Sequence, residues 1–296
     1  MAQKKTVFTG AGVALITPFL NGNVDYKSLE TILEQQIAGG TDAIIVCGTT
    51  AEPATLTDQE HKDIISFCVE KVNHRVPVVA GTGSNHTDYA VELTRFAKDA
   101  GADAVLLVTP YYNKASQKSL VRHFETIADA ADIPNILYNV PSRTGLNISL
   151  GAYKELAKHP NIVAAKEASG NLSSILQVME ACGDDLAIYS GNDDQIVPLM
   201  AMGAIGVISV LSNVMPRETH EMAQLCLDGK IQEAAKLQLK YLPLINGLFM
   251  QVNPIPVKAA MAKMGFCSGE MRMPLCEMDE EDNEKLYALM RDAKLI

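Results

Sequence analysis

Lys166 is the side chain in this sequence best placed for covalent chemistry. It ends the apolar run that begins at Ile162, and Glu167 follows it. A lysine at the mouth of a buried strand is poorly hydrated, which disfavours the ammonium and lowers its pKa. Because a lysine must lose its proton before it attacks a carbonyl, this segment predicts a Schiff-base nucleophile. Taken alone, it also fits a strand-end lysine whose ammonium reaches solvent or pairs with a carboxylate.

A short polar segment, Gly48-Thr49-Thr50-Ala51-Glu52, follows another apolar run. Its small residues let the backbone approach a ligand closely, and successive N–H groups can form a nest for an anion. The same composition suits an ordinary strand-to-helix turn. The segment is therefore a candidate carboxylate-binding loop, with the plain turn as the alternative.

Two further segments carry tyrosines directly after apolar runs. One contains Tyr111 and Tyr112, and the other contains Tyr138 followed by Arg143. Tyrosines at the mouth of a barrel can carry protons through their phenols or can simply pack at an interface. Arg143 can present its planar fork to a carboxylate, or it can form a surface ion pair while Tyr138 is ordinary core.

The sequence gives little support for a bound metal or cofactor. Asp193 and Asp194 are adjacent carboxylates, and we expect them to form a helix N-cap rather than a metal site. The six histidines form neither H-x-x-x-H nor H-E-x-x-H, and His61, between Glu60 and Lys62, is predicted to be exposed. Because Gly81-Thr82-Gly83 is too short for a nucleotide fingerprint and no Walker motif is present, we expect no cofactor and no metal.

The elements that must position these residues alternate regularly along the chain. Short apolar runs are separated by segments with helical periodicity, and they read as continuous apolar stretches, as parallel strands covered by helices do. The runs are Val13–Thr17, Ala43–Cys47, Val76–Ala80, Ala104–Val108, Asn135–Tyr138, Ile162–Ala165, Ala187–Tyr189 and Val207–Val210. Eight such runs predict an α/β fold, a (β/α)8 TIM barrel with its active site at the carboxyl ends of the strands.

The helical segments carry their own boundary signals. Thr57 followed by Glu60 is typical of a capping box at a helix start. After about residue 225 the pattern becomes helical only, with segments at 231–249, 257–263 and 280–294. We therefore expect a barrel with the active site over residues 1–225 and a C-terminal helical domain over residues 226–296.

Composition narrows the class of partner and the compartment. The net charge is −10, which argues against nucleic acid or an anionic membrane surface as the main partner. Six cysteines without a C-x-x-C pair suit reduced thiols, and no apolar run is long enough to span a bilayer. With no secretory signal recognised, the chain is predicted to be cytoplasmic.

Together these residues resemble the pyruvate-dependent class I aldolase and N-acetylneuraminate lyase superfamily. The resemblance rests on Gly48-Thr49-Thr50, on Tyr138 with Pro141 and Thr144-Gly145, and on Lys166-Glu167, and it covers nearly the whole chain. Three segments point, within the superfamily, to the dihydrodipicolinate (4-hydroxy-tetrahydrodipicolinate) synthase family. They are Thr109-Pro110-Tyr111-Tyr112-Asn113, Asn139-Val140-Pro141-Ser142-Arg143-Thr144-Gly145 and Asn253-Pro254-Ile255-Pro256-Val257-Lys258.

The resemblance implies a condensation of pyruvate with L-aspartate 4-semialdehyde, whose product feeds lysine and diaminopimelate biosynthesis. Lys166 would form an imine with pyruvate, while Thr49 and Thr50 hold the pyruvate carboxylate. Tyr138 would shuttle protons, linked through Thr50 to Tyr112.

The remaining implied roles concern the second substrate, the pocket and the assembly. Arg143 would bind the carboxylate of the aldehyde substrate, and the main chain at Gly191 and Ile208 would line the pocket. Because Tyr112 comes from a neighbouring subunit in this family, a homo-oligomer is expected, a dimer at least and a tetramer by analogy.

The chain departs from the family pattern in the loop after the second run, where Ala51 and Pro53 stand at unusual positions. The positions that match the lysine-binding pocket of lysine-inhibited relatives are Pro53, Asp58, His61, Asn85, Tyr89 and Tyr111. Tyr89 replaces the carboxylate that would hold the amine of the inhibitor. Weak or absent inhibition by lysine is therefore predicted.

Three alternatives stay open at this point. One is a lyase of the same superfamily that acts on N-acetylneuraminate or a 2-keto-3-deoxy sugar acid, although such a substrate offers no carboxylate to Arg143. The others are a barrel that only binds a ligand or partner and a metal-dependent aldolase.

Overall fold

Eight parallel strands close into a barrel in the computed structural model, which describes residues 4–296. Around the barrel they follow the order β1-β10-β9-β8-β7-β6-β5-β4. Their bounds are β1 Gly10–Ala14, β4 Ala43–Val46, β5 Val78–Gly81, β6 Ala104–Val108, β7 Asn135–Asn139, β8 Ile162–Glu167, β9 Ala187–Ser190 and β10 Gly206–Ser209. The (β/α)8 barrel that the apolar runs predict is therefore confirmed.

The first strand lies three residues earlier than the predicted Val13–Thr17. Strand β1 pairs with β10 from Gly10 opposite Gly206, where a Cβ on Gly206 would lie 2.2 Å from the Gly10 oxygen. The apolar run continues past the strand because Leu15 and Ile16 stay buried after the ladder ends. The chain then forms a small hairpin, with β2 at Phe19–Leu20 and β3 at Asn23–Val24.

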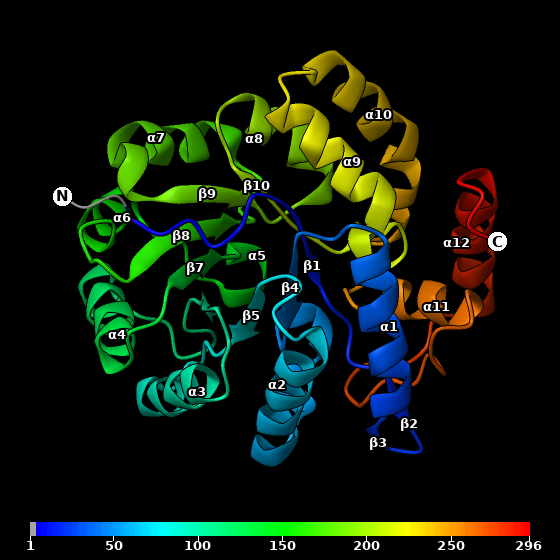
Figure 1. The fold of residues 1–296 in the computed structure, drawn as a ribbon, viewed down its shortest axis with the longest axis horizontal. Helices are drawn as coiled ribbons and strands as arrows, with labels where there is room; N and C mark the ends of the chain where they lie inside the picture. Colours follow the sequence, from blue (N-terminus) through cyan, green and yellow to red (C-terminus); the bar gives the residue numbers. More distant parts are fainter. Residues whose placement is uncertain (1–3) are drawn as a thin grey trace.

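Helices follow the strands and surround the barrel (Figure 1). They are α1 Tyr26–Ala38, α2 Asp58–Val72, α3 Thr87–Asp99, α4 Gln117–Ala130, α6 Leu150–Leu156, α7 Leu172–Cys182, α8 Ile196–Ala201 and α9 Pro216–Leu227, with the short α5 at Pro141–Thr144 after β7. The predicted capping box is present at the start of α2. The Glu60 N–H donates to Thr57 Oγ1 at 3.2 Å, and the Thr57 N–H donates to Glu60 Oε2 at 2.9 Å.

The strands are apolar throughout because both of their faces are buried. In β4, Ile45 packs in the barrel interior, whereas Ile44 and Val46 pack in the layer between strands and helices. The same alternation near the end of β8 places Ala164 in the interior and Ala165 in the outer layer. Lys166, two residues after Ala164, is therefore directed to the interior.

Three helices complete the chain: α10 Ile231–Gly247, α11 Ile255–Lys263 and α12 Glu280–Asp292. They lie together beyond α9 at one side of the barrel, and the chain ends after α12 (Figure 1). The boundary expected near residue 225 falls inside the last turn of α9, and the division into two domains stays a prediction. No helix within residues 4–296 has the length and apolarity needed to cross a membrane.

Candidate active site

Lys166 lies near the carboxyl end of β8, between two tyrosines on the neighbouring strands. In register it stands opposite Tyr138 of β7 and Tyr189 of β9. Its side chain is buried, and Nζ lies 4.3 Å from the centre of the Tyr138 ring. Lys258 is a buried lysine paired with a carboxylate, that of Glu52, whereas Lys166 lines a cavity of about 420 Å³. The amine is thus kept from bulk water while facing a space that a small molecule can enter.

That cavity brings together most of the residues expected to act. Thr50, Tyr138, Arg143, Lys166 and Gly191 all line it. Strand and helix ends from β4, β7, β8 and β9 meet here, as the carboxyl ends of barrel strands do. These five predicted residues therefore form one spatial cluster within a single chain.

Gly191 makes room for Lys166. A Cβ at this position would lie 3.1 Å from Lys166 Cε and 2.7 Å from the Cβ of Ala168. Any side chain at residue 191 would therefore push against the lysine stem. The prediction placed Gly191 in the lining of the pocket, and its place against the stem gives it a steric role there.

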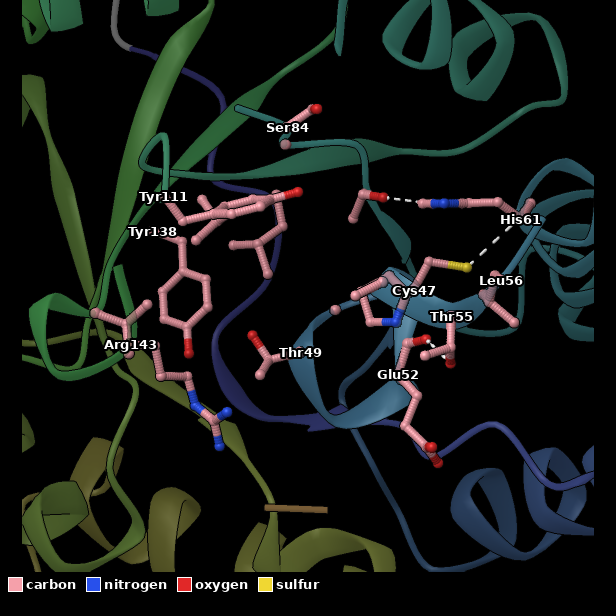
Figure 2. Close-up of a pocket in the computed structure, with 18 of the residues that line it drawn as sticks. Cys47, Thr49, Glu52, Thr55, Leu56, His61, Ser84, Tyr111, Tyr138 and Arg143 are labelled. Carbon is pink, nitrogen blue, oxygen red and sulfur yellow. Dashed lines mark hydrogen bonds between the residues drawn. The ribbon is translucent and has the colours of Figure 1, made fainter. Parts of the chain in front are cut away.

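A larger cavity of about 530 Å³ adjoins the first, sharing Tyr138 and Arg143 with it. Figure 2 shows Tyr138 and Arg143 on one side of this space, with Thr49 directed into it. Tyr111 also lines it, and its ring lies close to that of Tyr138 in the same view. Thr49 and Thr50 thus face adjoining cavities from consecutive positions in the loop.

Two expected residues are not brought to this cluster. Tyr112 is 93% exposed and adopts a left-handed backbone with φ 70°, and it lines neither cavity. Ile208 is fully buried in the barrel interior, and Val210 lines the smaller cavity in its place. A single chain therefore does not unite Tyr112 with Lys166.

The loop that carries Thr49 and Thr50 is a pair of 3-10 turns, η1 at Thr49–Ala51 and η2 at Pro53–Thr55. The left-handed residue between them is Glu52, with φ 56°, whereas Ala51 avoids a positive φ. Pro53 occupies the first position of η2, where its missing N–H has no intrahelical partner to lose. The unusual Ala51 and Pro53 are therefore both compatible with the loop backbone.

A buried ion pair anchors this loop to the rest of the protein. Lys258 Nζ donates to Glu52 Oε1 at 2.6 Å, with both side chains almost completely buried. The backbone N–H of Arg272 donates to the other carboxylate oxygen at 3.3 Å. These contacts hold Glu52 in a left-handed conformation that is unfavourable for a non-glycine residue.

Asn253 is a residue that the sequence motif contained but to which no role was given. It follows α10 and lines both cavities. Its Nδ2 donates to Thr50 Oγ1 at 2.9 Å, and its main-chain oxygen accepts from Arg143 Nη2 at 2.9 Å. The C-terminal segment thus contacts two of the predicted site residues.

Glu167 points to the opposite face of β8 from Lys166. It is buried and accepts hydrogen bonds from Tyr153 Oη, from Ser169 Oγ at 2.9 Å and from Asn139 Nδ2 at 3.1 Å. Burial raises the pKa of the Glu167 carboxyl, and these three donors oppose that shift. Glu167 therefore ties β7 to β8 behind the lysine.

The prediction that His61 is exposed is wrong. His61 is 6% exposed, and its Nε2 lies 2.8 Å from the Gly81 oxygen (Figure 2). Burial lowers the pKa of the His61 imidazole. The buried side chains of α2 are spaced three and four residues apart, and His61 is the first of them.

The N-cap predicted for Asp193 and Asp194 is also wrong. Both lie inside the 3-10 turn η4 at Asp193–Gln195, and the residue that precedes α8 is Gln195. The buried carboxylate of Asp193 instead accepts from the N–H groups of Val210 at 3.0 Å and Leu211 at 2.9 Å. Burial raises the pKa of Asp193, which these donors oppose.

A family model agrees with almost the whole chain. The model described as the dihydrodipicolinate synthetase family matches residues 7–293. The 4-hydroxy-tetrahydrodipicolinate synthase of Acetivibrio thermocellus is 52% identical over 294 residues, covering 99% of this chain and 100% of the relative.

Solved structures agree with the fold. The chloride-inhibited dihydrodipicolinate synthase of Acinetobacter baumannii in complex with pyruvate is 43% identical, with a TM-score of 0.96 over 98% of this chain and 100% of that one. A dihydrodipicolinate synthase described as a monomeric variant is 37% identical, also with a TM-score of 0.96, over 98% of each chain.

Proposed function

This chain belongs to the dihydrodipicolinate synthetase family and acts as a 4-hydroxy-tetrahydrodipicolinate synthase, and from that premise we propose how its own residues carry out the reaction. Lys166 captures pyruvate as an imine, and the resulting enamine attacks the aldehyde of L-aspartate 4-semialdehyde. The observation that supports this most is the buried amine of Lys166 facing a cavity shared with Thr50, Tyr138 and Arg143. The lyase acting on N-acetylneuraminate is not favoured, because the similar relative and the similar solved structure described above are both synthases.

The first step is attack of the neutral Lys166 amine on the keto carbon of pyruvate. The keto oxygen leaves as water, and the lone pair of the nitrogen forms the C=N bond of a protonated imine. The positive nitrogen then withdraws electrons from the methyl carbon, which loses a proton to give the enamine. The enamine carbon attacks the second substrate, so an electron sink built on one lysine serves both steps.

The proton transfers are assigned to Tyr138, whose ring lies beside Lys166 Nζ. A phenol with a reference pKa near 10 is a weak base at neutral pH, so it needs hydrogen-bonded partners. Thr50 lines the same cavity and is the candidate relay. Thr49 and Thr50 together hold the pyruvate carboxylate through their backbone N–H groups and the Thr49 hydroxyl, which leaves the Thr50 hydroxyl for the relay.

Arg143 is the residue proposed for the carboxylate of the second substrate. It is exposed at the shared edge of the two cavities, and Asn253 occupies part of its fork. Within residues 4–296 the other guanidinium N–H groups have no hydrogen-bond partner, so they can bind a carboxylate in this position. Because the chain carries a net charge of −10, such a local positive group helps to hold the carboxylate of the zwitterionic aldehyde substrate.

We propose that a second copy of the chain completes the site through Tyr112. The Tyr112 side chain is 93% exposed on a left-handed loop residue, so residues 4–296 of its own chain cover very little of it. A homodimer, or a tetramer built from such dimers, would bury it beside the Thr50 relay of a neighbour. The six cysteines are free thiols, which suits a reducing compartment, and we propose the cytoplasm.

The test compares two activities on one preparation. The protein is assayed for condensation of pyruvate with L-aspartate 4-semialdehyde and for cleavage of N-acetylneuraminate. We expect condensation only, and we expect Lys166→Ala to abolish it while thermal unfolding stays cooperative. Efficient cleavage of N-acetylneuraminate, or undiminished condensation by Lys166→Ala, would contradict the proposal.

A further inference from the structure

We propose that Asn253 is a positioning residue that fixes the direction in which Thr50 donates its hydroxyl proton. The inference rests on the proposed function, because it assigns Thr50 to the proton relay. Asn253 comes from the segment between α10 and α11, 203 residues away from Thr50 in the chain. Its amide nitrogen donates to Thr50 Oγ1 at 2.9 Å.

A threonine hydroxyl has one proton to donate and two lone pairs that accept. The Asn253 amide donates to one lone pair of the Thr50 oxygen. The Thr50 hydroxyl proton is therefore not used in this contact. The structure gives the Thr50 hydroxyl no other hydrogen-bond partner among residues 4–296. The proton is therefore available to the cavity that Thr50 shares with Tyr138 and Lys166.

Asn253 is held firmly enough to impose this direction. It is 6% exposed, and its main-chain oxygen accepts from Arg143 Nη2 at 2.9 Å. The side-chain oxygen Oδ1 is buried and finds no partner within the described chain. A buried polar atom left unpaired is unfavourable for folding, so stability alone does not explain an asparagine here.

The direction of the Thr50 proton decides what Tyr138 can do. If Thr50 donates to the Tyr138 oxygen, the phenol proton is turned away from Thr50 and towards the substrate. Tyr138 then gives this proton to the departing hydroxyl as the C–O bond breaks and the nitrogen lone pair forms the imine. The phenolate recovers a proton from the methyl carbon of the imine, whose C–H electrons become the C=C bond of the enamine.

The same residue contacts a group proposed for each substrate. Through its side chain it reaches Thr50 on the pyruvate side, and through its main chain it reaches Arg143 on the aldehyde side. A substitution of the side chain leaves the Arg143 contact in place. The effect of Asn253 on the relay can therefore be separated from its effect on the second substrate.

The decisive comparison is Asn253→Asp against Asn253→Ala. An ionised carboxylate has the shape of the amide but only accepts, so Thr50 would turn its proton towards it and away from the relay. We expect kcat to fall on the order of 100-fold in Asn253→Asp and about 10-fold in Asn253→Ala, with the KM for pyruvate nearly unchanged. Asn246→Asp, which adds the same charge on the exposed side of α10, is the matched control and should keep full activity.

Two further measurements distinguish this from a packing effect. Protonation of the introduced carboxyl restores a donor, so the kcat of Asn253→Asp relative to the unchanged protein should rise as the pH is lowered. In a Thr50→Val background, replacing Asn253 with either residue should change kcat less than about twofold, because the group through which it acts is gone. The cycle with Asn253→Ala carries this test even if Asn253→Asp fails to fold.

The proposal is overturned if Asn253→Asp and Asn253→Ala slow turnover equally at every pH, or if either effect persists in the Thr50→Val background. Failure of the proposed function gives a different result. In that case the unchanged protein itself would form no borohydride-reducible adduct with pyruvate. A normal adduct in the unchanged protein with an uncoupled Asn253 therefore rejects only the positioning role.

Discussion

At the scale of single residues, Lys166 and Glu167 are sequence neighbours with opposite tasks. Strand alternation turns Lys166 into the barrel, towards Tyr138 and the smaller cavity, and turns Glu167 outward to Tyr153, Asn139 and Ser169. The outward carboxylate anchors the strand end from which the lysine projects. The position of the Lys166 amine therefore depends on a strand that Glu167 anchors from the opposite face.

Tyr89 leads to a prediction about inhibition by lysine. It lines the larger cavity, and burial together with the neighbouring Asp58 carboxylate raises the pKa of the Tyr89 phenol to about 12. A neutral phenol at this position offers no carboxylate to the amine of a bound lysine. Millimolar lysine should inhibit condensation weakly or not at all, and Tyr89→Glu should become the more sensitive protein. Strong inhibition of the unchanged protein in a lysine titration would contradict this.

Residues differ in how far the sequence alone could place them. Lys166, Tyr138 and Arg143 were predictable because each follows an apolar run whose end must lie at the barrel mouth. His61 was misplaced because its charged neighbours suggested a surface, although its spacing from Ile64 and Ile65 puts it on the buried face of α2. The role proposed for Asn253 depends on a contact with Thr50, 203 residues away in the sequence, which no local pattern reveals.

At the scale of elements, the loop after β4 depends on the C-terminal helices. Glu52 holds the loop in a left-handed turn, and its partner Lys258 comes from α11. The expected division at residue 225 follows a real change of pattern, yet contacts across it shape the active-site loop. A change in the periodicity of hydrophobic residues along the sequence predicts where helices and strands lie. It does not predict which of these elements pack against each other.

The buried pair predicts a measurable asymmetry in stability. Lys258→Met should lower the free energy of unfolding by about 3–5 kcal/mol, because it leaves the Glu52 carboxylate buried without a counter-charge. Adding Glu52→Gln should recover a large part of that loss, since no uncompensated charge remains. Urea denaturation of the two variants measures both numbers. If Lys258→Met is as stable as the unchanged protein, the ion pair is dispensable for stability.

At the scale of the whole molecule, buried histidines couple stability to pH. Burial lowers the pKa of His123 to about 4, and it also lowers that of His61. Below the unfolded value near 6.5 the unfolded chain binds more protons at these sites than the folded protein does. Their contribution is therefore present above pH 6.5 and is lost as the pH falls towards 4.

His123→Gln isolates this contribution. The free energy of unfolding of the unchanged protein should drop more steeply between pH 6.5 and 4 than that of the variant, by on the order of 2 kcal/mol across the window. Denaturant titrations at several pH values provide the comparison. Parallel profiles would mean that His123 titrates alike in both states.

The proposed contribution of Tyr112 to the site of a neighbouring subunit predicts that two inactive variants can complement each other. Lys166→Ala and Tyr112→Phe should each be nearly inactive when prepared alone. If Tyr112 acts in the site of a neighbour, a hybrid dimer contains one intact site, and isolated hybrids should have about half of full activity. Co-expression with two different affinity tags isolates the hybrids. Hybrids as inactive as their parents would place Tyr112 within its own subunit or outside the mechanism.

The central claim is that the Lys166 amine captures a 2-oxo acid. Its most direct measurement is mass spectrometry of the protein after incubation with pyruvate and borohydride, followed by peptide mapping. A reduced pyruvyl group is expected on the peptide containing Lys166 and on no peptide of Lys166→Ala. An adduct on a different lysine, or active protein that acquires none, would contradict the account.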